Sequence, residues 1–156
     1  MRLRRLFLLV SLPLLMSRVA SAECPIVPGD IRTIARYSSV AFSGTVTRIE
    51  SISALRGGEA VTFDVERVWK GSPSKQFEVY NVGFAGIADG FFPFQNGTKY
   101  LVFAHRQTQE DRAAFGLAAS GPVAYRIGAC GQGTRTYEEA KGEIAKLGAG
   151  RAPSPR

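Results

Sequence analysis

The sequence predicts a mainly β fold: a five-stranded antiparallel Greek-key barrel of the OB type, with a short N-terminal helix and a C-terminal helix. Five short segments carry strand signals, and the helical signals are confined to the two ends of the chain. No strand alternates with a helix, as strands do in parallel α/β sheets. A sandwich of the immunoglobulin type would usually need about seven strands.

The N-terminal segment predicts export. Three arginines precede an apolar run from Leu6 to Met16, and residues 20–22 have the small-x-small pattern of a cleavage site. The run is shorter than the roughly 20 residues that span a bilayer. We therefore expect residues 1–22 to be a signal peptide and the mature chain, starting at Glu23, to be secreted or periplasmic.

The mature chain has the size of one domain, which we place at residues 23–149. Residues 1–22 hold four of the twenty basic residues and none of the thirteen acidic ones, so the formal net charge falls from +7 to +3 on cleavage. This charge is mild and is not clustered in a basic run. Nucleic-acid binding is therefore not expected, and no second apolar stretch predicts a membrane span.

The two cysteines, Cys24 and Cys130, have two possible roles. In an oxidising compartment they most simply form one disulfide. Closing a loop of this length would stabilise the fold by roughly 4–5 kcal/mol in the chain-entropy model. The rival hypothesis is a catalytic thiolate with His105, the one histidine, as its base.

The first predicted elements are a short helix and a long strand. The helix spans Asp30 to Tyr37, with Asp30 as its N-cap. From Ser39 apolar residues recur at every second position, and this strand ends near Ile52. Gly44 in its middle indicates a bulge or a bend of the kind that barrel strands need at corners.

Two further strands follow, at 61–68 and 76–82. The second strand is expected to turn these residues to one face: Val61, Phe63, Val65 and Arg67. The residues expected on its opposite face are Thr62, Asp64, Glu66 and Val68. A Gly and Pro segment at 69–73 ends it.

The second half of the chain predicts two strands and a helix. The fourth strand, Thr98 to His105, is almost wholly apolar, so both of its faces are expected to be covered. A polar turn is expected at 107–112 and the fifth strand at 113–119. Thr136 and Glu139 form a capping-box pattern that starts the last helix, which Gly148 ends.

That helix is expected to bury one stripe, made of Ala140, Ile144 and Leu147. The chain then ends in a Pro-rich segment, which we expect to be a disordered tail over residues 150–156.

Three segments carry a family resemblance: Val-Ala-Phe-Ser-Gly-Thr-Val at 40–46, Phe-Asp-Val-Glu-Arg-Val-Trp-Lys-Gly at 63–71 and Phe-Gln-Asn-Gly-Thr-Lys-Tyr-Leu-Val-Phe-Ala at 94–104. In order and spacing they resemble strand segments of tissue-inhibitor-of-metalloproteinase-like (netrin-like) domains. The resemblance covers nearly the whole mature chain. It implies an OB-fold barrel whose ends are tied by a disulfide between Cys24 and Cys130.

The sequence also departs from that family. Typical members open with Cys-x-Cys and carry another cysteine before the fourth-strand segment; here Ala22 and Gly90 stand at the two positions. Inhibitors of the family chelate the protease zinc through an N-terminal cysteine. That position falls on Ala22, inside the signal peptide, so this chelate is absent. Metalloendopeptidase inhibition through the N-terminal segment stays as an alternative function.

The connection from Gly83 to Gly97 is rich in glycine and phenylalanine. One interpretation makes it an aromatic loop that contacts a partner, with Phe91 and Phe92 as the exposed pair. The favoured interpretation places its rings in one end of the barrel, with Phe94 in the core. The residues we expect at a partner contact are Glu23, Cys24, Phe91 and Phe92.

Neither a catalytic nor a metal site is expected. The strand carboxylates fall mostly on the solvated faces: Glu50, Asp64, Glu66 and Glu78. One histidine cannot by itself make a zinc site. We therefore expect an exported, non-enzymatic OB-type domain without a cofactor. Its partner would be an extracellular or envelope protein, with a metalloprotease as one possibility.

Overall fold

The computed structural model describes residues 29–52, 58–82, 91–114, 123–127, 131 and 133–155. The predicted signal peptide (1–22), Glu23, Cys24 and Cys130 lie outside these residues, so their predictions stay predictions. Within the described part of the chain, no helix is long and apolar enough to cross a membrane.

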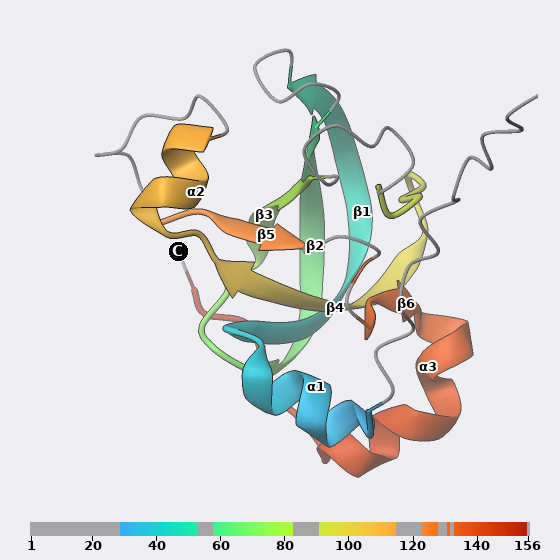
Figure 1. The fold of residues 1–156 in the computed structure, drawn as a ribbon. Helices are drawn as coiled ribbons and strands as arrows, with labels where there is room; N and C mark the ends of the chain where they lie inside the picture. The colour runs from blue at the N-terminus through green and yellow to red at the C-terminus, as the bar shows by residue number, and fades with distance from the viewer. Residues whose placement is uncertain are drawn as a thin grey trace, which may run out of the picture.

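Five strands close into a barrel (Figure 1). They are β1 (Val40–Ile52), β2 (Gly58–Lys70), β3 (Gln76–Asn81), β4 (Lys99–Arg106) and β5 (Tyr125–Ile127). Their order around the barrel is β1-β2-β3-β5-β4, and β4 pairs with β1 to close the ring. The two-residue strand β6 (Arg135–Thr136) adds to the start of β4. The predicted mainly β barrel is confirmed, and it is consistent with an OB-like barrel.

The expectation that all strands run antiparallel is wrong. β3 and β5 are parallel, with Tyr80 opposite Arg126 and Asn81 opposite Ile127. The other pairings in the ring are antiparallel. A closed ring with an odd number of strands cannot alternate direction throughout, so at least one neighbouring pair must be parallel.

β1 and β2 are long and irregular in register. Their pairing shifts between Ser43 and Gly44, which confirms the irregularity predicted there. The shift places Glu66 of β2 without a paired residue on β1, so Glu66 and Arg67 are both exposed and Val68 is buried. The predicted faces of Arg67 and Val68 are therefore wrong, because a bulge reverses the alternation beyond it.

The barrel interior is filled from all five strands. Its buried residues are Val40, Phe42, Val46, Val61, Phe63, Val65, Val68, Val79, Phe94, Tyr100, Val102, Ala104 and Ile127. The rings of Phe42 and Phe63 meet edge to face with centroids 5.4 Å apart, an arrangement that aromatic pairs prefer.

A second apolar cluster lies outside the barrel, where Figure 1 shows two helices packed beside the strands. Helix α1 (Ile31–Tyr37) and helix α3 (Tyr137–Ile144) cover Leu101 and Phe103 of β4. Both faces of β4 are therefore buried, as predicted. The short helix η3 (Ala145–Leu147) continues α3.

The ends of these helices test the predicted caps. The capping box of Thr136 and Glu139 is confirmed. Asp30 stands at the N-cap of α1 but makes no side-chain cap bond; its carboxylate pairs with Arg32 at 3.1 Å instead. Gly148, with φ 81°, ends η3.

The region after β4 differs from the prediction. Residues predicted as a polar turn and the start of the fifth strand form helix α2 (Gln109–Ala114). The rest of that predicted strand, 115–119, lies outside the described residues. The fifth strand of the barrel is Tyr125–Ile127, which is only three residues long and is defined by its pairing with β3 and β4.

The C-terminal segment also differs from the predicted disordered tail. Arg151 forms an antiparallel bridge with Val68, and Ser154 forms a parallel bridge with Ser74. The segment is ordered because it continues the hydrogen bonding of the sheet beyond β3.

Candidate functional site

A candidate contact surface lies at the rim of the barrel where β3 ends. Asn81 holds its backbone in place. The Asn81 side chain is 1% exposed and faces inward with Val79. Its amide donates to the Phe92 carbonyl at 2.8 Å and accepts from the Phe92 N–H at 3.2 Å. It also donates to Glu59 at 2.9 Å. Asn81 therefore fixes the backbone of Phe92 within the long connection, and we call these bonds the Asn81 clamp.

In the segment from 91 to 94, the rings of Phe92 and Phe94 pack in the core. Phe92 packs against the core, with its ring centroid 4.6 Å from Phe94 and 5.7 Å from Tyr100. Phe94 is 8% exposed and meets Phe63 at 5.5 Å, which confirms its predicted core position. Because the Phe92 ring packs against this cluster, it is not the freely exposed ring that the partner-contact interpretation expected.

The other two residues of the segment lie outside that ring cluster. Pro93 is exposed, and Phe91 is partly buried but is not among the residues that pack against the described core. Gln95 donates its N–H to the Tyr100 hydroxyl at 3.0 Å, which holds the other end of the segment. Of the predicted pair, Phe91 thus keeps a place at the rim, beside Pro93.

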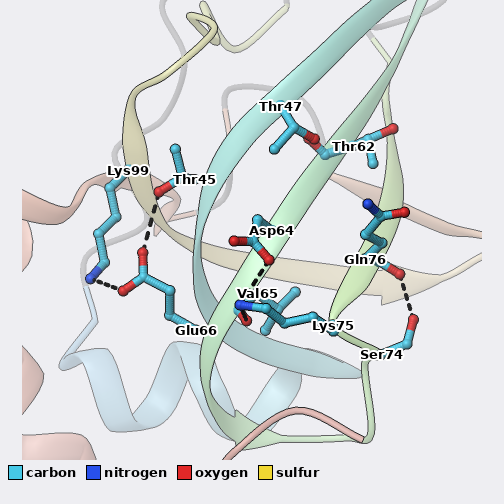
Figure 2. A network of polar contacts seen from close by, with 10 residues as sticks. All are labelled: Thr45, Thr47, Thr62, Asp64, Val65, Glu66, Ser74, Lys75, Gln76 and Lys99. Carbon is cyan, nitrogen blue, oxygen red and sulfur yellow. Dashed lines mark hydrogen bonds and ion pairs between the residues drawn. The ribbon is translucent and has the colours of Figure 1, made fainter. Parts of the chain in front are cut away.

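A polar outer face covers β1, β2 and β3 (Figure 2). Glu66 accepts from Lys99 at 2.5 Å and from the Thr45 hydroxyl at 3.2 Å. Asp64 pairs with Lys75 at 2.8 Å, and Lys75 also donates to the Val65 carbonyl at 3.2 Å. Figure 2 shows these contacts running across the strands rather than meeting at one point.

The other two strand carboxylates share one arginine. Arg48 lies 3.5 Å from Glu50 and 3.9 Å from Glu78. All four carboxylates therefore lie on the surface, as predicted, and each has a cationic partner.

A second set of polar side chains lies across the neighbouring strands β3, β5 and β4. Tyr80 is opposite Arg126, which is opposite His105. Burial, and then the charge and hydrogen bond of Glu78, raise the pKa of Tyr80 above its ordinary value, while Arg112 partly lowers it. Across the described ranges, no group of three or more His, Cys, Asp or Glu residues is placed to hold a metal.

The sequence-based reasoning missed Asn81 as a positioning residue. A signal was present, because Asn81 continues the apolar face of Phe77 and Val79 and is the one polar residue on it. A polar residue on a buried face must find hydrogen-bond partners. Here it finds them in Glu59 and in the backbone of Phe92.

No protein-family model matches the chain, and a search of curated proteins finds no matching sequence.

Proposed function

We propose that this protein is an exported, non-enzymatic domain that binds another extracellular or envelope protein through the rim around Phe91 and Pro93. The observation that carries this proposal is the Asn81 clamp, in which the Asn81 side chain bonds both the N–H and the carbonyl of Phe92. A loop held by a rigid scaffold is a typical recognition surface. The inward rings of Phe92 and Phe94 hold the segment, and Phe91 and Pro93 are not among the residues of the described core cluster.

The surface charges support a binding role over a hydrolytic one. The four strand carboxylates are each engaged with lysine or arginine, from 2.5 to 3.9 Å. These pairs place positively and negatively charged side chains beside one another on the same face. A face of this kind suits a binding domain better than acid–base chemistry.

Site-specific crosslinking tests the proposal. A photoreactive amino acid replaces Phe91 in one variant and Tyr37 in another; Tyr37 lies on α1 and is 76% exposed. We expect a discrete crosslinked partner from the native extracellular milieu at position 91 and not at position 37. Unlabelled wild-type protein in excess should compete for it, and the Phe91→Ser variant should compete less well. The same product at both positions, or equal competition, would contradict the proposal.

The family resemblance supports a second candidate, inhibition of a metalloendopeptidase through the N-terminal segment. A closed five-stranded barrel is the fold that the resemblance implies. Titration of a zinc endopeptidase with the mature chain tests it. Inhibition that is lost on trimming Glu23 and Cys24 would favour this function, and no inhibition at micromolar excess would remove it.

A further inference from the structure

We propose that the edge of β2 beyond Asp64, next to the turn between β2 and β3, is a binding site for an extended peptide with the pattern Arg-x-Pro-Ser. In this structure the chain's own C-terminal segment, residues 151–155, occupies the site; we call this segment the strap. The site lies at the opposite end of β2 from Glu59 and the rim, so it does not depend on the proposed function.

This part of the β2 edge has no pairing with β3, because β3 is shorter than β2. β3 pairs with β2 only from Glu59 to Asp64. Beyond Asp64 the strap takes the place of a neighbouring strand: Val68 and Arg151 exchange two backbone hydrogen bonds, both of 2.8 Å. This is the doubly bonded pair of an antiparallel ladder, and it is how added strands bind to sheet edges.

The turn recognises the arginine side chain of the strap. The Arg151 guanidinium donates to the Gly71 carbonyl and to the Ser72 hydroxyl, the latter at 3.2 Å. Gly71 has φ 71°, and a Cβ there would lie 2.5 Å from a methyl carbon of Val40. The turn is therefore fixed in a conformation that requires glycine. Its carbonyl is held in place for the several donors that a guanidinium presents.

The rest of the strap defines the remaining pattern. The Ser154 N–H donates to the Pro73 carbonyl at 3.0 Å, and Ser154 lies opposite Ser74 in a parallel bridge. Pro153 has no N–H to leave unsatisfied and favours the extended backbone. The second position, Ala152, is exposed and can be any residue.

The strap can be replaced without removing the helix before it. Arg67 and Trp69 bind the carbonyls of Ala149 and Gly148, at 2.5 and 2.9 Å. The residue after that anchor is Gly150, with φ 65°. From Arg151 onward the strap is mostly exposed and buries no large apolar side chain, so main-chain and arginine hydrogen bonds hold it. A partner segment with the same pattern can form the same bonds.

Peptide binding to the full mature chain tests the site. The probe is a fluorescent peptide, Gly-Arg-Ala-Pro-Ser-Pro, and its matched control has alanine in place of the arginine. The proteins are the wild type and two variants that weaken the strap from different ends, Arg151→Ala and Ser154→Pro. The Ser154→Pro variant keeps Arg151 and removes the N–H that bonds to Pro73.

We expect the arginine peptide to bind both variants about tenfold more tightly than the wild type, in which the strap competes. The alanine peptide should bind about tenfold more weakly than the arginine peptide. In NMR spectra the arginine peptide should shift the amide signals of Val68 and Ser74.

Three results would overturn the proposal. Equal binding of the two peptides, or amide shifts confined to residues away from this edge, would show that the turn does not select arginine. A wild-type dimer that the arginine peptide dissociates would make a second copy of the chain the occupant instead of a partner protein.

Discussion

Gly44 of β1 lies directly against the backbone carbonyl of Asp64 in β2. A Cβ at Gly44 would be 2.8 Å from that oxygen and 3.2 Å from the Cα of Val65. The two strands can approach this closely at the register shift only because residue 44 has no side chain. Gly44 is paired on both sides, with Val65 of β2 and with Tyr100 of β4.

The Gly44→Ala variant is expected to lose about 1–3 kcal/mol of unfolding free energy, because the backbone of β2 must move to admit the methyl group. Urea denaturation measures this loss. Gly142→Ala is the matched control: Gly142 lies in α3, and a Cβ there would meet nothing within 4 Å beyond its own helix backbone. That change should stabilise the protein by about 0.5–1 kcal/mol through helix propensity. A neutral Gly44→Ala would contradict the close approach.

The Asn81→Ala variant removes three hydrogen bonds from the rim. We expect a loss of about 1–3 kcal/mol in unfolding free energy, since the partly buried Phe92 N–H loses its partner and the Phe92 carbonyl keeps only the bond from the Phe94 N–H. Hydrogen exchange of the Phe92 amide should also become faster. Asn96→Ala, at an exposed turn position, should change stability by less than about 0.5 kcal/mol. Unchanged exchange at Phe92 would contradict the clamp.

Replacement by serine separates the two rim phenylalanines. Phe92→Ser should lower the unfolding free energy by about 2–4 kcal/mol, because its ring packs against Phe94 and Tyr100. Phe91→Ser should cost less than about 1 kcal/mol, since Phe91 does not pack against that cluster in the described structure. Thermal unfolding of both variants compares them directly. Equal losses would assign Phe91 to the core.

The capping box makes part of the stability depend on acid pH. Hydrogen bonds from the Thr136 side chain and backbone lower the pKa of Glu139. A carboxyl with a lowered pKa stabilises the fold above its unfolded pKa, about 4.3 for glutamate, and loses this contribution as pH falls through the folded value. The stability difference between the wild type and Glu139→Gln should therefore shrink between pH 6 and pH 3. Glu138→Gln, in the same helical turn but outside the capping box, should show a smaller pH dependence.

The disulfide between Cys24 and Cys130 remains a prediction from the sequence. Alkylation of the exported protein without reduction should add no mass, and alkylation after reduction should add two labels. Two labels without prior reduction would show free thiols and remove the disulfide from the account of this fold.

Much of the barrel could be predicted because its signals are local. Alternating apolar residues mark β1, β2 and β3, and the continuous apolar run marks β4 as buried on both faces. The Thr136 and Glu139 pair marks the start of α3 for the same reason, since a capping box acts within one helical turn. The parallel pair could also have been deduced, because five strands in a closed ring require one.

The candidate surfaces were less predictable. A sequence rich in phenylalanine cannot show which ring faces inward, and the backbone of Phe92 is held by Asn81 of β3. The Pro-rich end reads as a disordered tail, yet Arg151 binds a turn that lies far away in the sequence.

By itself, the sequence determined where β1 to β4, α1 and α3 form and most of the residues that they bury, because periodicity and caps act over a few neighbouring residues. Only the tertiary structure decided that Tyr125–Ile127 is the fifth strand, that Phe92 packs inward and that Arg151 extends the edge of β2. Each of these depends on hydrogen bonds or packing between distant segments, and such contacts leave no repeating pattern in the segment itself.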